Sequence, residues 1–308
     1  IIFIFSFLFS QDYAGLSGSF LRVGITARSI AMGGAFTAEK DHGFSTFYNP
    51  AWAAFLVDRQ VGLSYSSMSL DRRLSGLSFA TPLPPTAGLG IAWVSAGVTD
   101  IQGRSSAGEK TTVMQTSEDA LMISFAQRIL PWFSFGVNIK ILQNQLPINE
   151  SYKGSGIGFD VGLLFKSGKS TTLGLMIQDI NSMYNWDSGD LYAQGRIYSE
   201  YFPTIYRFGT KFNYKNIRVV ADAGFITNYR IGKELSEDIF INLMPRVGVE
   251  YTYQDLYFFR GGLGNGRIAF GWGLEYDLIK NHDSRIDYTF SMDWASQLAH
   301  TLSYAFNF

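Results

Sequence analysis

The sequence predicts an all-β protein, a transmembrane antiparallel β-barrel of about 14 strands with an N-terminal plug or hatch segment inside the lumen. Residues 299–308 (AHTLSYAFNF) alternate apolar and polar side chains up to the aromatic Phe308. Side chains alternate across a strand, so this segment has one apolar and one polar face. The same pattern recurs upstream, and residues 1–10 form a short apolar run. In a closed barrel the apolar faces meet lipid and no strand edge is left unpaired.

Residues 1–10 (IIFIFSFLFS) are too few for a spanning helix and suit the core of a secretory signal peptide, with cleavage after Ser10. No other stretch approaches 18 uncharged apolar residues, so we expect no transmembrane helix. The expected organisation is a signal-peptide remnant at 1–10, a plug or hatch at 11–58 and a barrel at 59–308. The expected location is the bacterial outer membrane.

Composition excludes several classes of function. The 308 residues carry a formal net charge of −1, which argues against a nucleic-acid partner. The absence of Cys excludes disulfides and thiolate metal sites, and the 3 His residues show no metal-ligand spacing. No carboxylate pair or Ser–His arrangement suggests catalysis. We therefore expect no enzyme activity, no cofactor and no metal.

The segment 22–57 has no long period-two run and is expected to fold as the plug. The Gly33-Gly34 pair permits close approach to the wall or a positive φ, and Pro50 fixes a turn after Asn49. Arg28 is a candidate partner for an inward-facing carboxylate. The alternative is a periplasmic cap with no gating role.

Alternating segments after residue 59 predict the strands, with clear examples at 203–214, 216–226, 266–277 and 283–294. Others lie at 132–142, 155–167 and 241–253, with weaker ones at 60–69, 72–81, 87–97, 118–128, 171–180 and 255–263. With the final strand this gives about 14, an even number. A soluble sandwich or propeller also alternates, but strand length and aromatic residues near strand ends favour the membrane barrel.

The connections alternate between short and long, as in outer-membrane barrels with short periplasmic turns and longer external loops. The expected long external loops are 98–117, 143–154, 181–202 and 227–240. Inward-facing positions carry charges of both signs, which we expect to pair with each other and with the plug. This lumen charge ladder comprises Arg207, Lys211, Arg218, Asp222, Arg246, Glu250, Glu275 and Asp287.

Two phrases in the N-terminal segment carry a family resemblance. G-x-x-A-R-x-x-x-M-G-G-A-F-T-A at 24–38, followed by S-T-F-Y-N-P-A at 45–51, resembles the PorV/PorQ group of FadL-like outer-membrane proteins. The resemblance implies a 14-stranded barrel with a lumenal plug or hatch. Its motif residues here are Arg28, Met32, Gly33, Gly34, Phe36, Tyr48, Asn49 and Pro50.

The resemblance leaves two functions open. As in PorV, the protein would be a plugged barrel in type IX secretion that engages secretion-pore components or delivers cargo to the surface. Alternatively, as in FadL-like barrels, it would transport long-chain fatty acids or other hydrophobic small molecules. A candidate external aromatic cluster for collecting such a ligand comprises Tyr184, Trp186, Tyr192, Tyr198, Tyr201 and Phe202. Packing against the rim or anchoring at the membrane interface would explain the cluster equally well.

Expected partners are outer-membrane lipid and the barrel-assembly machinery, for which Phe308 would serve as the assembly signal. Secretion-pore components or an apolar ligand would join them, according to which function holds.

Overall fold

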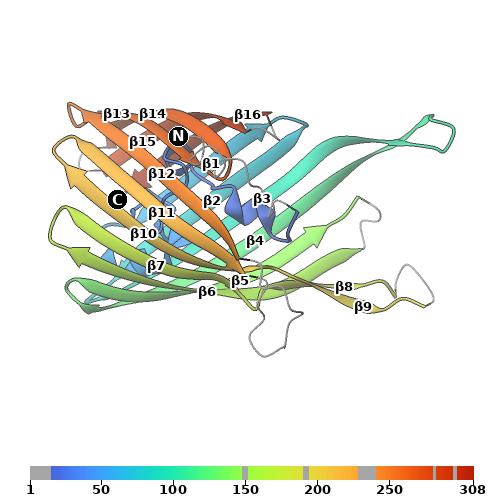
Figure 1. Ribbon diagram of the computed structural model, residues 1–308, viewed down its shortest axis with the longest axis horizontal. Coiled ribbons are helices and arrows are strands. Elements are labelled where there is room, and N and C mark those ends of the chain that lie inside the picture. Colours follow the sequence, from blue (N-terminus) through green and yellow to red (C-terminus); the bar gives the residue numbers. More distant parts are fainter. Residues whose placement is uncertain (1–14, 148–151, 190–193, 228–240, 280–281, 294–296) are drawn as a thin grey trace.

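The structure is a computed structural model that describes residues 15–147, 152–189, 194–227, 241–279, 282–293 and 297–308. It is a closed antiparallel β-barrel preceded by four short helices (Figure 1). The helices are η1 (Ser19–Arg22), α2 (Ala27–Ala31), α3 (Ser45–Tyr48) and η2 (Pro50–Phe55). The predicted signal peptide at 1–10 lies outside the described residues.

The sheet contains 16 strands. The first eight are β1 (Gln60–Met68), β2 (Arg72–Leu83), β3 (Ala87–Arg104), β4 (Lys110–Leu130), β5 (Phe133–Gln145), β6 (Lys153–Ser167), β7 (Thr171–Ile180) and β8 (Met183–Asp187). The others are β9 (Ile197–Tyr201), β10 (Thr204–Tyr214), β11 (Ile217–Thr227), β12 (Ile241–Tyr253), β13 (Tyr257–Gly264), β14 (Arg267–Ile279), β15 (His282–Asp293) and β16 (Gln297–Asn307).

The barrel closes because its first and last strands pair. β1 is antiparallel to β16, with Gln60 opposite Asn307 and Met68 opposite Ala299. The additional pairing of β5 with β6 closes the ring. β8 and β9 form a hairpin that branches from β6, so 14 of the 16 strands make up the ring. The predicted antiparallel barrel of about 14 strands is confirmed.

Alternation along each strand separates the outer surface from the lumen. In β3, Leu89, Ile91 and Trp93 are 37–50% exposed on the outside, while Ala92 and Val94 between them are buried. Exposing this apolar surface to water would cost about 25 cal/mol per Å². Contact with lipid avoids that cost. In the described ranges no helix has the length and apolarity to cross a membrane.

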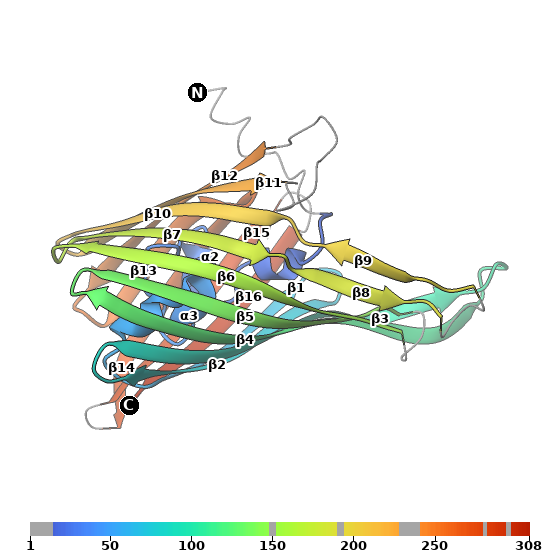
Figure 2. The same ribbon diagram turned by 90° about the horizontal axis from the view of Figure 1, so that it is seen from below.

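Two predicted external loops contain strand structure. Within 98–117, β3 and β4 continue as a long hairpin, and 181–202 contains the β8–β9 hairpin. Both hairpins project from the same end of the barrel (Figure 2). The expectation of loops there is wrong because backbone pairing continues beyond the apolar band. The predicted loop at 227–240 lies, apart from Thr227, outside the described residues.

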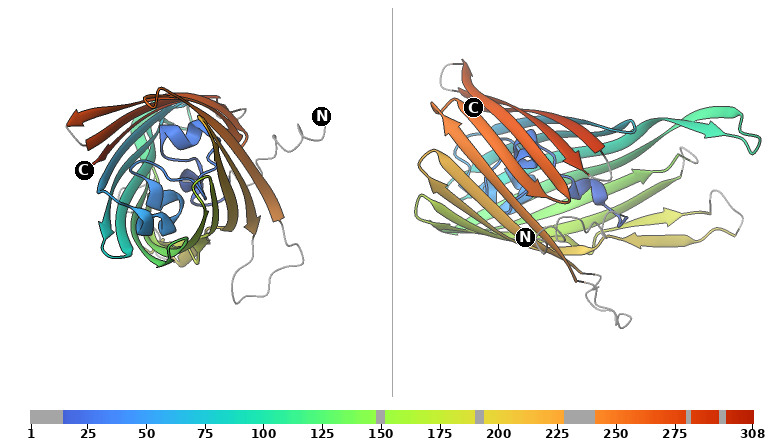
Figure 3. Two further views of the ribbon diagram at one scale, coloured as in Figure 1. Left: turned by 90° about the vertical axis from the view of Figure 1, so that its left-hand side faces the viewer. Right: turned by 45° about the horizontal axis from the view of Figure 1, so that its top comes forward.

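The N-terminal segment, residues 15–58, runs through the interior of the barrel (Figure 3). Its backbone comes so close to the wall that only glycine fits opposite it. A Cβ on Gly136 would lie 2.5 Å from the Ala51 nitrogen, and one on Gly174 would lie 2.2 Å from the Thr37 oxygen. These contacts explain part of the high glycine content of the strands.

Candidate functional site

The two halves of the N-terminal motif pack against each other inside the barrel. The Tyr48 hydroxyl accepts hydrogen bonds from the backbone nitrogens of Ile25 and Thr26, at 3.0 and 3.1 Å. Its ring lies 5.3 Å from that of Phe36. Asn49 donates to the Thr37 carbonyl at 2.8 Å. The motif is therefore one folded unit.

Local sequence explains the turns of this unit. The Thr26 side chain caps α2 by accepting from the Ser29 nitrogen, and Asn49 caps η2, in which Pro50 is the first residue. Gly33 and Gly34 have φ of +67° and +74°, the left-handed region that favours glycine. Motif residues Arg28, Met32, Phe36 and Asn49 have no measurable exposure.

Arg28 connects the segment to the barrel wall. Its Nε lies 2.9 Å from Glu250 Oε2 on β12, and its Nη2 lies 2.7 Å from Glu39 Oε1. Burial alone would lower the pKa of Arg28, but Glu250 and Glu39 overcome this effect and raise the pKa well above its ordinary value. Arg28 thus has the inward carboxylate partner that its sequence position suggested.

Glu250 also forms ion pairs with three arginines of the barrel wall. Arg260 Nε and Arg218 Nη1 each lie 2.5 Å from its carboxylate, and Arg285 Nη2 lies 3.5 Å away. Arg260 and Arg285 in turn contact Asp287. We call this set, together with Arg28 and Glu39, the Glu250 network. It joins the N-terminal segment to β11, β12, β13 and β15.

The lumen charge ladder occupies both buried and partly exposed positions. Arg207, Asp222, Arg246, Glu250 and Asp287 are buried, each at 7% exposure or less. Lys211, Arg218 and Glu275 are only partly buried. Asp222 accepts from the backbone and hydroxyl of Thr37, so it contacts the segment directly.

Buried titratable groups also lie on the segment beside the network. Burial raises the pKa of Asp41 to about 7, and its carboxyl accepts a 2.5 Å hydrogen bond from Thr26. Burial and the charge of Arg285 hold the pKa of His42 well below its ordinary value. His42 Nε2 lies 3.0 Å from Arg285 Nη1, which suits a neutral imidazole.

A second charge cluster was not predicted. Lys140 Nζ lies 2.6 Å from Asp160 Oδ1 and also contacts Asp179, and all three side chains are at most 3% exposed. The cluster sits where β7 ends and the chain bends into β8. The register of β6 against β7 shifts at the same place. Alternation within 132–142 and 155–167 was the signal that could have identified Lys140 and Asp160.

The predicted external aromatic cluster is divided in the structure. Tyr184, Trp186 and Phe202 are buried together, with ring centroids 4.9–6.0 Å apart. Tyr198 is 65% exposed and Tyr201 is intermediate. Tyr192 lies outside the described residues. The three buried rings are therefore not part of an exposed surface in this structure.

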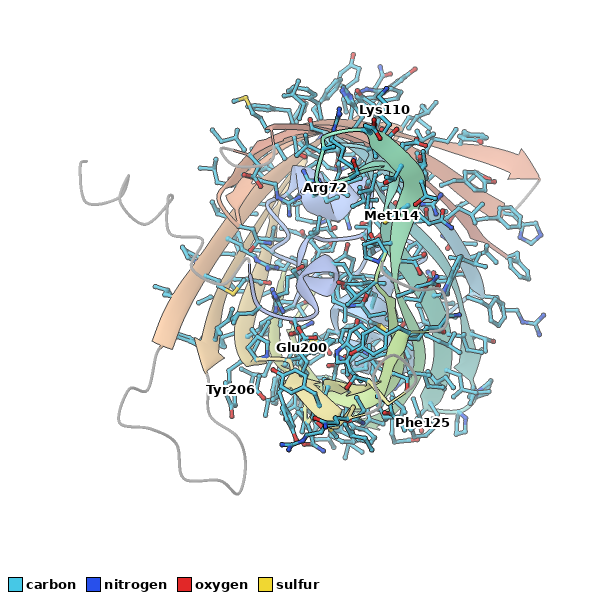
Figure 4. The ribbon with its side chains drawn as sticks, turned by 90° about the vertical axis from the view of Figure 1, so that its right-hand side faces the viewer. Arg72, Lys110, Met114, Phe125, Glu200 and Tyr206 are labelled. Carbon is cyan, nitrogen blue, oxygen red and sulfur yellow. The ribbon has the colours of Figure 1, made fainter. Side chains whose placement is uncertain are left out.

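Glu200 of β9 connects this rim to the N-terminal segment by hydrogen bonds. Its carboxylate accepts from Ser17 Oγ at 2.5 Å and from Trp186 Nε1 at 3.0 Å. Figure 4 shows Glu200 pointing into the mouth of the barrel, while Phe125 and Tyr206 project outward. The exposed Phe308 pairs its backbone with Arg59.

The interior contains an extended apolar cluster and no group of metal ligands among the described residues. Among the described residues no three His, Cys, Asp or Glu side chains gather as metal ligands. A single apolar cluster runs from Tyr184, Trp186 and Phe202 at the rim to Phe20, Phe36 and Phe47 of the segment.

No protein-family model and no curated protein matches the chain. Several solved structures do, across nearly their whole length. The CymD monoaromatic hydrocarbon channel has a TM-score of 0.65 at 16% identity, covering 93% of this chain and 98% of its own. The P. putida toluene transporter TodX has 0.62 at 15% identity, covering 92% and 99%.

A Pseudomonas aeruginosa FadL homologue aligns with a TM-score of 0.57 at 11% identity, over 92% of this chain and 97% of its own. At such identities the likeness concerns the fold. The protein therefore has the FadL-like fold, a closed 14-stranded membrane barrel of the kind seen in these channels.

Proposed function

We propose that this protein is a bacterial outer-membrane channel for small hydrophobic molecules, and that residues 11–58 act as its plug. The observation that carries the proposal is the apolar cluster that continues from the rim hairpin to the segment in the lumen. Small apolar solutes gain free energy along such a lining, whereas hydrated ions lose their water.

CymD is a hydrocarbon channel and TodX a toluene transporter, which favours transport over type IX secretion, including its PorV/PorQ-type role. Insertion by the barrel-assembly machinery, with Phe308 in the signal, belongs to the same proposal. Outer-membrane lipid then surrounds the exposed aromatic and aliphatic residues.

Uptake of toluene by intact cells tests the proposal. Cells that carry the protein should take up toluene faster than cells without it, with no gain for a sugar of similar size. Tyr184→Glu places a charge in the apolar cluster and should lower toluene uptake severalfold. Tyr198→Glu changes an exposed tyrosine of the same hairpin and is the matched control.

Heat-modifiable migration on gels verifies that both variants form barrels. Equal toluene uptake with and without the protein would exclude the channel function. Equal uptake by the two folded variants would exclude the apolar cluster as the path.

A further inference from the structure

Two cations of the barrel wall stand beside the aromatic rings of η2. This helix packs inside the barrel against β4, β5 and β6. Lys166 is the penultimate residue of β6, and Arg128 lies two residues before the end of β4. Both are therefore next to the short turns that lead to β7 and β5, and both are only partly buried.

The ammonium group of Lys166 rests on these rings. Its Nζ lies 3.6 Å from the centroid of the Phe55 ring and 5.1 Å from that of Trp52. The guanidinium carbon of Arg128 lies 6.0 Å from the Phe55 centroid. Aromatic faces attract cations and hold them in place, but they carry no net negative charge. We call Lys166, Arg128, Trp52 and Phe55 the η2 site.

The surroundings of Lys166 are positive. Within the described ranges, none of the ion pairs includes Lys166 or Arg128. The charged groups that act on Lys166 are all cations, namely Lys211, Lys40 and Arg128. Carboxylates act on Lys211 and Lys40 as well, yet none acts comparably on Lys166. An anion placed beside Lys166 therefore lowers the repulsion among these cations.

Trp52 supplies a second donor that has no acceptor. Its side chain is 3% exposed, and its buried Nε1 has no hydrogen-bond partner among the described residues. A buried donor without an acceptor is costly. Because Lys166 Nζ lies 5.1 Å from the centroid of the Trp52 ring, one group with two acceptor oxygens and bonds of about 2.8 Å spans both donors.

We infer that the η2 site binds an oxyanion, the carboxylate or phosphate group of a small solute, between the Lys166 ammonium and the Trp52 indole N–H. Arg128 adds a second positive charge, and Phe55 adds apolar surface. The site lies at the opposite end of β6 from the β8–β9 hairpin. The inference is separate from the proposed transport, because binding to the purified protein tests it without any transport step.

Calorimetric titration of the purified full chain in neutral detergent, at an ionic strength fixed with chloride, tests the inference. The probes are benzoate, inorganic phosphate and benzamide, which has the ring of benzoate without its charge. Benzoate should bind more tightly than benzamide. Phosphate binding as tightly as benzoate identifies the free ion as sufficient, and tighter binding of benzoate shows that the attached ring contributes; both results support the site.

Two variants locate the bound oxyanion. Lys166→Gln should weaken benzoate binding by about tenfold or more. Trp52→Phe keeps an aromatic ring without the N–H donor and should weaken it severalfold. Lys169→Gln removes the same charge from an exposed position in the turn after β6 and should leave binding unchanged. Absence of oxyanion binding, equal affinity for benzoate and benzamide, or unchanged affinity in either site variant would overturn the inference.

The wild-type protein decides the matter if heat-modifiable migration shows that a site variant does not fold. Acetic anhydride acetylates lysines, and mass spectrometry measures the rate at each one. Benzoate should slow acetylation of Lys166 and leave that of the exposed Lys169 unchanged. Equal acetylation of Lys166 with and without benzoate contradicts an oxyanion bound at its ammonium group.

Discussion

Glu250 has no measurable exposure, and four guanidinium groups reach its carboxylate from the N-terminal segment and the wall. The desolvation cost of each ion is offset only while the whole set is present. Removing the charge of Glu250 deprives four guanidinium groups of a shared anionic partner. Removing Arg28 leaves Glu250 with three cationic partners.

Glu250→Gln should therefore destabilise the protein more than Arg28→Gln does. Loss of one partner from a buried pair costs about 3–5 kcal/mol, and the value for Glu250 should reach at least the upper end. Guanidinium unfolding in detergent micelles measures the difference. Glu109→Gln, at an exposed position, provides the baseline. Equal losses for the two buried variants would contradict the central role of Glu250.

The raised pKa of Asp41 predicts how stability depends on pH. The folded protein keeps the proton up to about pH 7, whereas the unfolded chain releases it near its ordinary value of 3.8. The folded state therefore binds more protons between these values, and stability falls as pH rises through that window.

Asp41→Asn mimics the neutral acid and should remove this component of the fall in stability. Melting temperatures of both proteins across the window provide the measurement. Parallel curves for wild type and variant would show that Asp41 is ionised in the folded state.

Single residues differ in how well the sequence identified them. Alternation placed Glu250 and Asp287 on the inner face, and both are buried there. Arg28 was predicted to pair with an inward-facing carboxylate because it is a cation in the segment expected to lie inside the barrel. Glu39 is the second partner of Arg28. The sequence around Glu39 has no periodic pattern, so the ion pair could not be predicted without the path of the whole segment.

At the scale of elements, β8 bends across the inner face of β6. A Cβ on Gly156 would lie 1.7 Å from the Met183 oxygen, and one on Gly158 would lie 1.9 Å from Ser182 Oγ. Glycines on the inner face of β6 therefore make room for β8, and the Lys140–Asp160–Asp179 cluster fixes the bend beside them.

Gly156→Ala should displace β8 without preventing barrel formation. Because the chain has no Cys, Ser182→Cys supplies a single thiol at a position only 1% exposed. Maleimide should label this thiol faster in the Gly156→Ala background. Gly261→Ala, where the nearest atom to the new Cβ would be 3.7 Å away, should not change the rate. Equal labelling rates in both backgrounds would refute the close packing of β8 on β6.

Strands were predictable where they cross lipid, because one face must be apolar and the other faces the lumen. The outer parts of β3 and β4 stand beyond that band. There Thr111, Thr112 and Val113 are all exposed, so buried and exposed side chains no longer alternate. The backbones of β3 and β4 nevertheless remain paired. This is why the sequence indicated a loop at 98–117.

At the scale of the whole molecule, the N-terminal segment lies inside the barrel, where the Glu250 network joins it to the wall and glycines of the strands allow its close approach. A ring of 14 strands is too wide for its own side chains to fill. The segment's path was not predictable, because it is set by contacts with strands more than 200 residues away.

Deletion of residues 22–57 should raise single-channel conductance in planar bilayers, because it removes the atoms that occupy the lumen. The full-length protein measured in the same bilayers is the control, and heat-modifiable migration verifies folding of the deletion. Unchanged conductance in a folded deletion barrel would show that the segment does not obstruct the lumen.

The hydrogen bonds that join α2 to β15 and β16 have a consequence for the order of folding. The Ala27 nitrogen donates to Ser303 Oγ, and the Ala27 carbonyl accepts from Thr289, although these residues lie 276 and 262 positions apart. Helix α2 thus gains its binding surface only after β15 and β16, the last two strands, have joined the barrel. Until then the apolar residues of α2 lack the surface that buries them in the folded barrel, so α2 should become ordered only after the barrel has closed.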